Sequence, residues 1–168
     1  NMGGSPKDLY EAGIRLSFEE NNISSGVESY LANTGKVEGY KDPLKGQSGQ
    51  TYDYSGSINT AVTVAWAGGD FEKSLEQIIT QKWIANFPNG MESWSEYRRT
   101  GYPKLMPMAA NASSGIVDDT EGARRMPYPT DEYRENKESV EAAVLTLTQE
   151  SKTKKGDSMA THVWWDCK

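Results

Sequence analysis

The first hydrophobic positions of the chain are spaced as they are in an α-helix. Ser5 and Pro6 mark its start, because serine caps the N-termini of helices and proline is accepted at the first helical position. The periodic pattern continues to about residue 22. Its apolar side chains fall on two adjoining faces, with Leu9, Ala12 and Leu16 on one and Ile14 and Phe18 on the other. We therefore expect this helix to pack on two sides.

A second periodic segment, residues 71–87, predicts the longest helix of the chain. Asp70 stands at its N-cap, and the pattern stops before Pro88, Asn89 and Gly90. Apolar residues recur along it at helical spacing: Phe71, Leu75, Ile78, Ile79 and Trp83. Such a stripe is typical of the side of a helix that faces the core, so we expect these side chains to be buried.

Shorter helices are expected around this one. One covers residues 25–33, and another is capped by Asn89 and ended by Gly101 and Pro103. Residues 138–147 predict a final helix, whose inward-facing side chains are Val140, Ala143, Val144 and Leu147. We also expect Thr130 to cap a turn through Tyr133, and the closing sequence HVWWDCK to dock against the rest of the chain.

The remaining chain shows little regular structure. Residues 34–57 contain several glycines, Pro43 and no periodicity, which predicts a long loop of the kind that is functional or disordered in compact domains. After it, alternation of Val62, Val64 and Trp66 is consistent with a short strand. The pattern as a whole predicts a mainly α fold with one long loop.

Composition points towards recognition. The chain has 168 residues, enough for one domain, and we expect residues 1–168 to form a single segment. Only 36% of the residues are apolar, with a mean hydropathy of -0.74, yet there are nine Tyr and five Trp against three Phe. Tyr and Trp pair a large apolar face with a polar tip, which suits wet binding surfaces.

Charge and cysteine content exclude several classes of function. The net charge of -6 argues against a general electrostatic hold on nucleic acid or anionic lipid. Cys167 is the only cysteine, so an intrachain disulfide and a cysteine-based zinc site are excluded. No apolar run reaches the roughly 18 residues that a membrane-spanning helix needs, and the first residues do not form a signal peptide.

Catalytic signals are weak. The only histidine, His162, lies near the end of the chain, where we expect a surface or tail residue. The acidic sequence VDDTEG holds Asp118, Asp119 and Glu121, which could ligate calcium, but its spacing is not that of an EF-hand and favours a solvated turn. The glycine-containing sequence AGGDFEKS lacks the spacing of a phosphate-binding loop. We expect no catalytic residue, no metal and no cofactor.

Four aromatic residues are the best candidates for ligand binding. They are Tyr40, Tyr52, Tyr54 and Trp66, in or just beyond the long loop. Aromatic faces presented by loops stack on the C–H faces of sugars, and neighbouring polar groups supply hydrogen bonds. The alternative interpretation is that these rings fold back and cover the helices beneath the loop.

Four blocks of sequence carry a resemblance when taken together. They are LYEAGIRLSFEENNI, LEQIITQKWIANFPNGMESWSEYRRTGYPKL, RRMPYPTDEYRENKESVEAAV and VWWD. In order and spacing they resemble the C-terminal part of the SusD/RagB family, most closely its SusD-like branch. The resemblance implies a helical and loop-rich part that packs on a tetratricopeptide-type helical region largely absent from this chain.

The same resemblance implies a function. Such proteins capture oligosaccharides at the outer membrane, without catalysis, and pass them to a SusC-like TonB-dependent transporter. The lipid anchor is expected on an absent N-terminal part, and Cys167 is not the lipid-bearing cysteine. Three alternatives stay open: a peptide-binding member of the family, a hydrolase, and a structural segment that supports the transporter contact.

The aromatic and basic block MESWSEYRRTGYP is expected to position the chain and not to contact ligand. Trp94 and Tyr97 can pack on the helix that carries Trp83, while Arg98 or Arg99 can bind helix-terminal carbonyl oxygens, or a carboxylate in bidentate fashion. The block RRMPYP is expected to act in a similar way.

Overall fold

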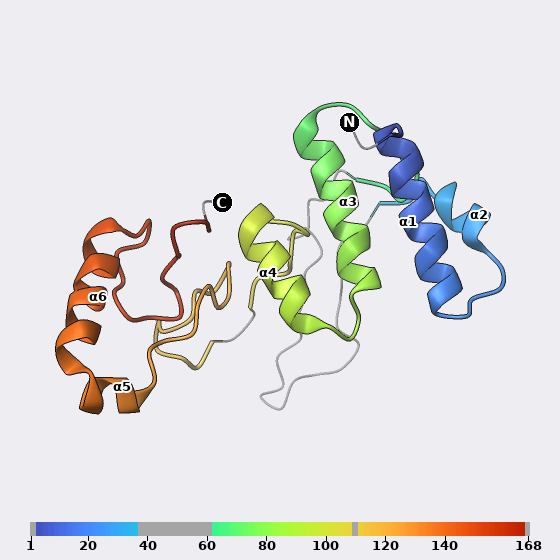
Figure 1. Cartoon of the computed structure of the whole chain (residues 1–168). Coiled ribbons are helices and arrows are strands. Elements are labelled where there is room, and N and C mark those ends of the chain that lie inside the picture. Colours follow the sequence, from blue (N-terminus) through green and yellow to red (C-terminus); the bar gives the residue numbers. More distant parts are fainter. Residues whose placement is uncertain (1–2, 37–61, 109–110, 167–168) are drawn as a thin grey trace, which may run out of the picture. The chain divides into compact units, whose positions relative to one another are not determined.

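The computed structural model describes residues 3–36, 62–108 and 111–166, and this part of the chain is mainly helical, as predicted (Figure 1). Its helices are α1 (Pro6–Glu20), α2 (Val27–Leu31), α3 (Phe71–Ala85), α4 (Gly90–Thr100), α5 (Thr130–Glu135) and α6 (Lys137–Glu150). No strand occurs among these residues, and an isolated bridge joins Asp118 to Gly122.

The predicted helix caps are confirmed at three helices. The Ser5 hydroxyl accepts from the N–H of Asp8 at the start of α1, in a capping box. Asp70 accepts from the N–H of Lys73 at 2.8 Å, and Asn89 caps α4. Each cap satisfies a backbone N–H that has no partner within its own helix.

The ends of two other elements complete this comparison. α4 ends at Gly101, whose φ of 74° lies in the left-handed region that favours glycine. The expected cap at Thr130 is wrong, since Thr130 is already helical and Pro129, with extended backbone, occupies the N-cap of α5.

The chain divides into two compact units. Unit 1 contains α1, α2, α3 and α4 up to Tyr97, together with residues 101–105. Unit 2 contains α5, α6, Arg98–Thr100 and the closing segment of the chain. Each unit has its own set of buried side chains and is described by itself.

The core of unit 1 lies where α1 and α2 meet residues 62–66. Its buried residues are Tyr10, Ile14 and Leu31, and Phe18, Val27, Tyr30, Val64 and Trp66 pack against them. The predicted strand at residues 62–66 is wrong. In the described part of the chain these residues form no strand, and their backbone bonds to side chains of the helices instead.

The face that α3 buries differs from the predicted stripe. Its buried residues are Glu76, Gln77 and Ile79, whereas Phe71 is 74% exposed and Ile78 is 40% exposed. The expectation that the whole stripe is core is therefore wrong for Phe71 and Ile78. The reason is that residues 63–67 form hydrogen bonds with Gln77, which turns that side of α3 inward.

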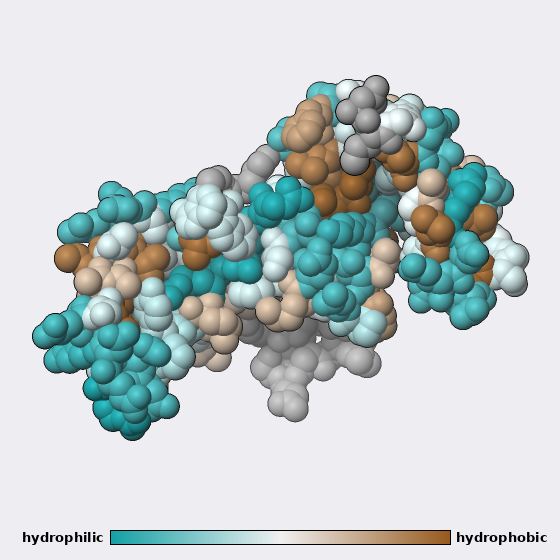
Figure 2. All heavy atoms as spheres, in the orientation of Figure 1, coloured by the Kyte–Doolittle hydropathy of each residue, from teal (hydrophilic) through white to brown (hydrophobic). Residues whose placement is uncertain are grey.

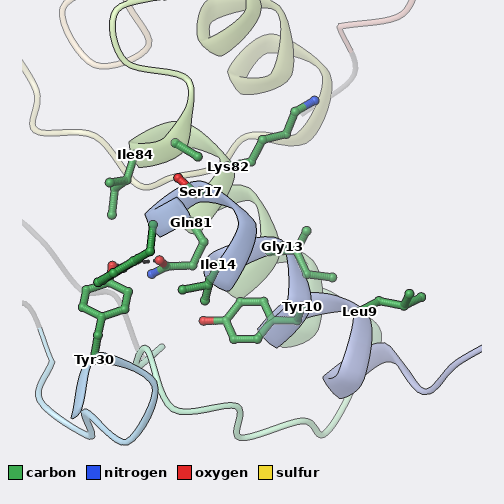
Figure 3. Close-up of a pocket in the computed structure, with 12 residues that line it drawn as sticks. Leu9, Tyr10, Gly13, Ile14, Ser17, Tyr30, Gln81, Lys82 and Ile84 are labelled. Carbon is green, nitrogen blue, oxygen red and sulfur yellow. Dashed lines mark hydrogen bonds between the residues drawn. The ribbon is translucent and has the colours of Figure 1, made fainter. Parts of the chain in front are cut away.

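The second apolar face of α1 is not covered by the described residues. Leu9 is 49% exposed and Leu16 is 58% exposed, on the other side of the helix from the buried Ile14. Figure 2 shows hydrophobic surface between α1 and α3. A cavity of about 310 Å³ opens there, lined by residues that include Gly13, Ile78 and Ile84 (Figure 3). Among the described residues, α1 contacts both α2 and α3, but its Leu9, Ala12 and Leu16 face stays exposed, so the expected burial of both apolar faces is wrong.

Candidate functional site

Trp66 is the one predicted ligand-binding residue whose surroundings can be described. Tyr40, Tyr52 and Tyr54, and residues 37–57 of the predicted long loop, lie outside the described residues. Trp66 belongs to unit 1, where its ring is half-buried at the edge of the core cluster.

The Trp66 ring packs against Tyr10 of α1. Its centroid lies 5.0 Å from that of Tyr10, with 48° between the ring planes. The Tyr10 hydroxyl donates a 2.7 Å hydrogen bond to the Val64 carbonyl oxygen. Burial raises the pKa of Tyr10 to about 12, so the hydroxyl stays protonated to a higher pH than that of an exposed tyrosine. The ring and the backbone before it are therefore tied to the same side chain.

Gly68 shapes the edge of the same ring. Its φ of +60° lies in the left-handed region, and a Cβ added there would sit 3.3 Å from Trp66 Nε1. A larger residue at this position would be strained by its backbone and crowded by the indole. The turn after Trp66 thus depends on glycine for two separate reasons.

The backbone around Trp66 is bonded to α3. Gln77 Nε2 donates to the carbonyl oxygens of Thr63 at 2.8 Å and of Ala65 at 3.0 Å. Gln77 Oε1 accepts from the N–H of Ala67 at 3.2 Å. A further bond, from the Ala65 N–H to the Asn33 carbonyl oxygen at 2.8 Å, ties this segment to the end of α2.

A cavity of about 530 Å³ lies beside Trp66. Its lining includes Trp66, Phe71, Ser5, Lys7, Asp70 and Ser74. Two aromatic rings with hydroxyl, carboxylate and ammonium groups around them can provide stacking surfaces and hydrogen bonds together. That combination suits a flat, hydroxyl-rich ligand such as a sugar ring.

Sequence reasoning missed Phe71 as a member of this site. Its helical spacing suggested a core position, but it is the first residue of α3 and follows the Gly68–Gly69 turn. A residue in the first turn of a helix has no preceding turn to cover it. That position was the available signal.

The predicted packing of MESWSEYRRTGYP on the helix that carries Trp83 is confirmed for Tyr97. In unit 1, the Tyr97 ring meets the Trp83 ring edge-on, with 6.4 Å between centroids. In unit 2, Arg98 Nη1 donates to the carbonyl oxygen of Arg124 at 2.8 Å, and its guanidinium lies 4.6 Å from the centre of the Trp165 ring. Burial lowers the pKa of Arg98, and the charge of Arg124 adds to this effect while Asp166 opposes it.

Arg124 and Asp166 form a buried ion pair in unit 2. The Arg124 side chain is 2% exposed and that of Asp166 is 0% exposed. Arg124 Nε donates to Asp166 Oδ2 at 2.8 Å, and Arg124 Nη2 donates to Oδ1. This is the bidentate geometry of a strong pair. It fastens the closing segment of the chain, as the docking of HVWWDCK predicted.

His162 departs from its expected place. It is 2% exposed and not a surface residue, because both of its ring nitrogens face polar groups of unit 2. Nδ1 lies 3.1 Å from the Asp166 carbonyl oxygen, and Nε2 lies 2.7 Å from Glu121 Oε2. The expectation of a surface position is therefore wrong, and His162 is a buried residue of the closing segment. The apolar residues that follow it in VWWD were the signal that the tail is packed.

The acidic sequence VDDTEG forms a tight turn. Asp118 Oδ1 accepts from the N–H groups of Glu121 and Thr120 and from the Thr120 hydroxyl, at 2.8 to 3.0 Å. These hydrogen bonds, that of Glu121 first, hold the pKa of Asp118 at about 2. Within the described residues, no group of three or more His, Cys, Asp or Glu side chains could hold a metal ion.

Comparison with known families gives one match that spans nearly the whole chain. The model of SusD-like proteins, described as SusD and RagB outer membrane lipoprotein, matches residues 1–166. No curated protein gives a significant match. Among the helices in the described ranges, none is both long and apolar enough to cross a membrane.

Solved structures agree with this match. A SusD homologue from Bacteroides ovatus is 88% identical with a TM-score of 0.87, and the match covers 100% of this chain and 34% of that one. A SusD homologue from Bacteroides uniformis is 49% identical with a TM-score of 0.83, covering 100% and 33%. A chitin-binding SusD homologue from Flavobacterium johnsoniae is 43% identical with a TM-score of 0.79, covering 99% and 32%. The chain thus spans about a third of the length of these relatives.

Proposed function

Because the chain belongs to the SusD/RagB family of outer membrane lipoproteins, we propose that it is part of a protein that binds oligosaccharide at the bacterial outer membrane. In this proposal the protein breaks no bond and delivers its ligand to a SusC-like TonB-dependent transporter. It is exposed at the cell surface, and its lipid anchor belongs to a further N-terminal part.

The cavity beside Trp66 is the observation that carries this proposal. It combines the Trp66 and Phe71 rings with polar groups of Ser5, Lys7 and Ser74. Phe71 is 74% exposed, so its ring is accessible to a ligand. The proposed glycan contacts are Trp66 with Tyr40, Tyr52 and Tyr54 of the predicted loop.

The chitin-binding relative suggests the first ligands to try. Its 43% identity extends over 99% of this chain, so the similarity includes the segment that carries Trp66. Chitin oligosaccharides carry sugar rings with apolar C–H faces that can stack on indole and phenyl rings. They are therefore the reference ligands, and other plant, host and bacterial oligosaccharides complete the panel.

The test is calorimetric titration of the intact protein that contains this sequence, with a peptide panel alongside the glycans. We expect saturable glycan binding that Trp66→Ala weakens by about tenfold or more, since stacked rings contribute energies of this order. Trp83→Ala is the control, because Trp83 packs on Tyr97 and lies outside the lining of this cavity. The melting temperature of each variant is measured as well, so that a loss of folding is not taken for a loss of glycan binding.

The other outcomes are distinct. Binding of peptides without binding of glycans would support the peptide-binding alternative. If Trp66→Ala leaves the affinity for glycan unchanged, the ligand site lies in another part of the protein and this segment has a structural role. Release of reducing sugar by the purified protein would contradict the non-catalytic assignment.

A further inference from the structure

One buried amide side chain forms hydrogen bonds with the backbone on both sides of Trp66, the residue proposed to bind glycan. Gln77 is 1% exposed, the lowest value among the buried residues of α3. It donates hydrogen bonds to the carbonyl oxygens of Thr63 and Ala65, which precede Trp66 in the sequence. It accepts one from the N–H of Ala67, which directly follows Trp66. Gln77 therefore holds the backbone on both sides of the ring.

The hydrogen-bonding capacity of this side chain is matched to its partners. A primary amide has two N–H donors and a carbonyl acceptor, and Gln77 uses both ends, with Nε2 bonded to two carbonyl oxygens and Oε1 to one N–H. Burial of an amide costs free energy unless such partners are present. An aliphatic residue could fill the same space on α3, but it could not bond to this backbone.

The segment that Gln77 holds lacks the support of regular secondary structure. Residues 62–70 form neither helix nor strand, so no ladder of backbone hydrogen bonds fixes the direction of the Trp66 side chain. Tyr10 supplies a second hold through its hydroxyl bond to Val64 and its ring contact with Trp66. Two side chains from α1 and α3 thus replace the support that a sheet would give.

We propose that Gln77 is a positioning residue for the glycan site, which holds residues 63–67 so that the Trp66 ring is already oriented before the sugar arrives. This inference rests on the proposed role of Trp66. A ring fixed in advance loses less conformational freedom when ligand binds, so affinity is gained without an added contact. Gln77 itself touches no ligand in this proposal.

The test compares Gln77→Met with Gln81→Met in the intact protein. Gln81 lies one turn further along α3 and also accepts a partly buried hydrogen bond, from the Tyr30 hydroxyl at 2.8 Å (Figure 3). It is therefore a matched control that changes the same residue type on the same helix without touching the Trp66 segment. Two quantities are measured, the affinity for the oligosaccharide that binds best and the NMR resonance of the Trp66 indole N–H, assigned by its loss in Trp66→Ala.

We expect Gln77→Met to shift or broaden the Trp66 indole resonance and to weaken glycan binding by about three- to tenfold, less than Trp66→Ala does. Gln81→Met should leave both quantities unchanged. An unmoved resonance in Gln77→Met would overturn the inference, as would an affinity loss no larger than that of Gln81→Met.

The failure of the proposed function would look different. If Trp66→Ala leaves glycan binding unchanged, Trp66 is not the platform, and a displaced resonance in Gln77→Met would then assign Gln77 a purely structural role. Should Gln77→Met not fold, Gln77→Glu replaces it, because this change removes the Nε2 donor to Thr63 and Ala65 and keeps the shape of the side chain. It should also move the indole resonance and weaken binding, and a normal resonance with normal affinity would contradict the proposal.

Discussion

The two units differ in the kind of side chain that each one buries. In unit 1 the buried cluster consists of Tyr10, Ile14 and Leu31. In unit 2 the most completely buried large side chains include Arg124 and Asp166. Apolar packing is non-directional, whereas a buried charge needs a particular partner at a particular place. The same chain therefore uses two ways of stabilising a fold.

This difference affects what each kind of packing allows. Unit 1 leaves Leu16 of α1 more than half exposed, and likewise Ile84, which lines the α1–α3 cavity, so further apolar packing on these side chains would break no existing bond. The ion pair of unit 2 already satisfies both of its members, and any change to one leaves the other buried without its partner. We therefore expect substitutions in unit 1 to lower the unfolding free energy in proportion to the apolar surface that they remove. Loss of either partner of the ion pair in unit 2 should lower it in one large step.

The largest expected effect is at the buried ion pair. Arg124→Met should cost about 3–5 kcal/mol of unfolding free energy, because it leaves the Asp166 carboxylate buried without its partner. Arg134→Met is the control, since Arg134 is 71% exposed in its pair with Asp131 and should cost no more than about 1 kcal/mol. Urea denaturation of both variants measures the difference. Equal losses would show that the buried pair is not what holds unit 2.

The next effect tests the apolar core of unit 1. Ile14 is 6% exposed, and Ile14→Ala should cost about 2–5 kcal/mol through lost burial and a new cavity. Leu16→Ala, two positions along the same helix, should cost about 0.5 kcal/mol or less in this 168-residue chain, because Leu16 is 58% exposed. Thermal unfolding compares the two. Similar losses in this chain would contradict the exposure of the Leu16 face of α1.

A smaller effect of opposite sign is expected at Gly13. This glycine lies inside α1 and lines the α1–α3 cavity, and a Cβ added there would meet nothing within 4 Å. Gly13→Ala should therefore stabilise this chain by about 0.5–1 kcal/mol, the gain of alanine over glycine in an exposed helix. In an intact protein with both faces of α1 covered, the sign should reverse because the new methyl group would meet the covering chain. Denaturation of both forms checks the two signs.

The smallest effect concerns the pH dependence of unit 2. The pKa of Asp118 falls from its ordinary 3.8 to about 2 in the folded chain, so this carboxylate contributes stability above about pH 4. That contribution is lost as the pH falls through 2. Asp118→Asn should be less stable than the unmodified chain at pH 6, and this difference should shrink towards pH 2. Denaturation at a series of pH values measures it, and a constant difference would contradict the assigned role.

Local signals predicted the helices well. The caps at Ser5, Asp70 and Asn89 and the end of α4 at Gly101 were readable because each depends on residues within about one helical turn. The same holds for the inward side of α6, where Val140 is buried as its spacing indicates. The sequence blocks shared with SusD-like proteins also predicted the family, which the match over residues 1–166 confirms.

Signals that depend on distant residues were less readable. The spacing of Phe71 and Ile78 matched a core stripe, but both side chains are exposed. The buried side of α3 carries Gln77 instead, which forms hydrogen bonds with residues 63–67. For Trp66, the sequence identified a candidate ring without its support from Tyr10 and Gln77. His162 was misplaced because its partner Glu121 lies far away along the chain.

The amino-acid sequence by itself determined where α1, α3 and α4 begin, where α4 ends, and which family the chain belongs to. Tertiary structure alone decided which faces are buried, how Trp66 is supported, and that a charged pair is buried in unit 2. The physical reason is one of range. Caps and helical periodicity act between residues a few positions apart, whereas Tyr10 and Trp66, or Arg124 and Asp166, meet only after the chain has folded.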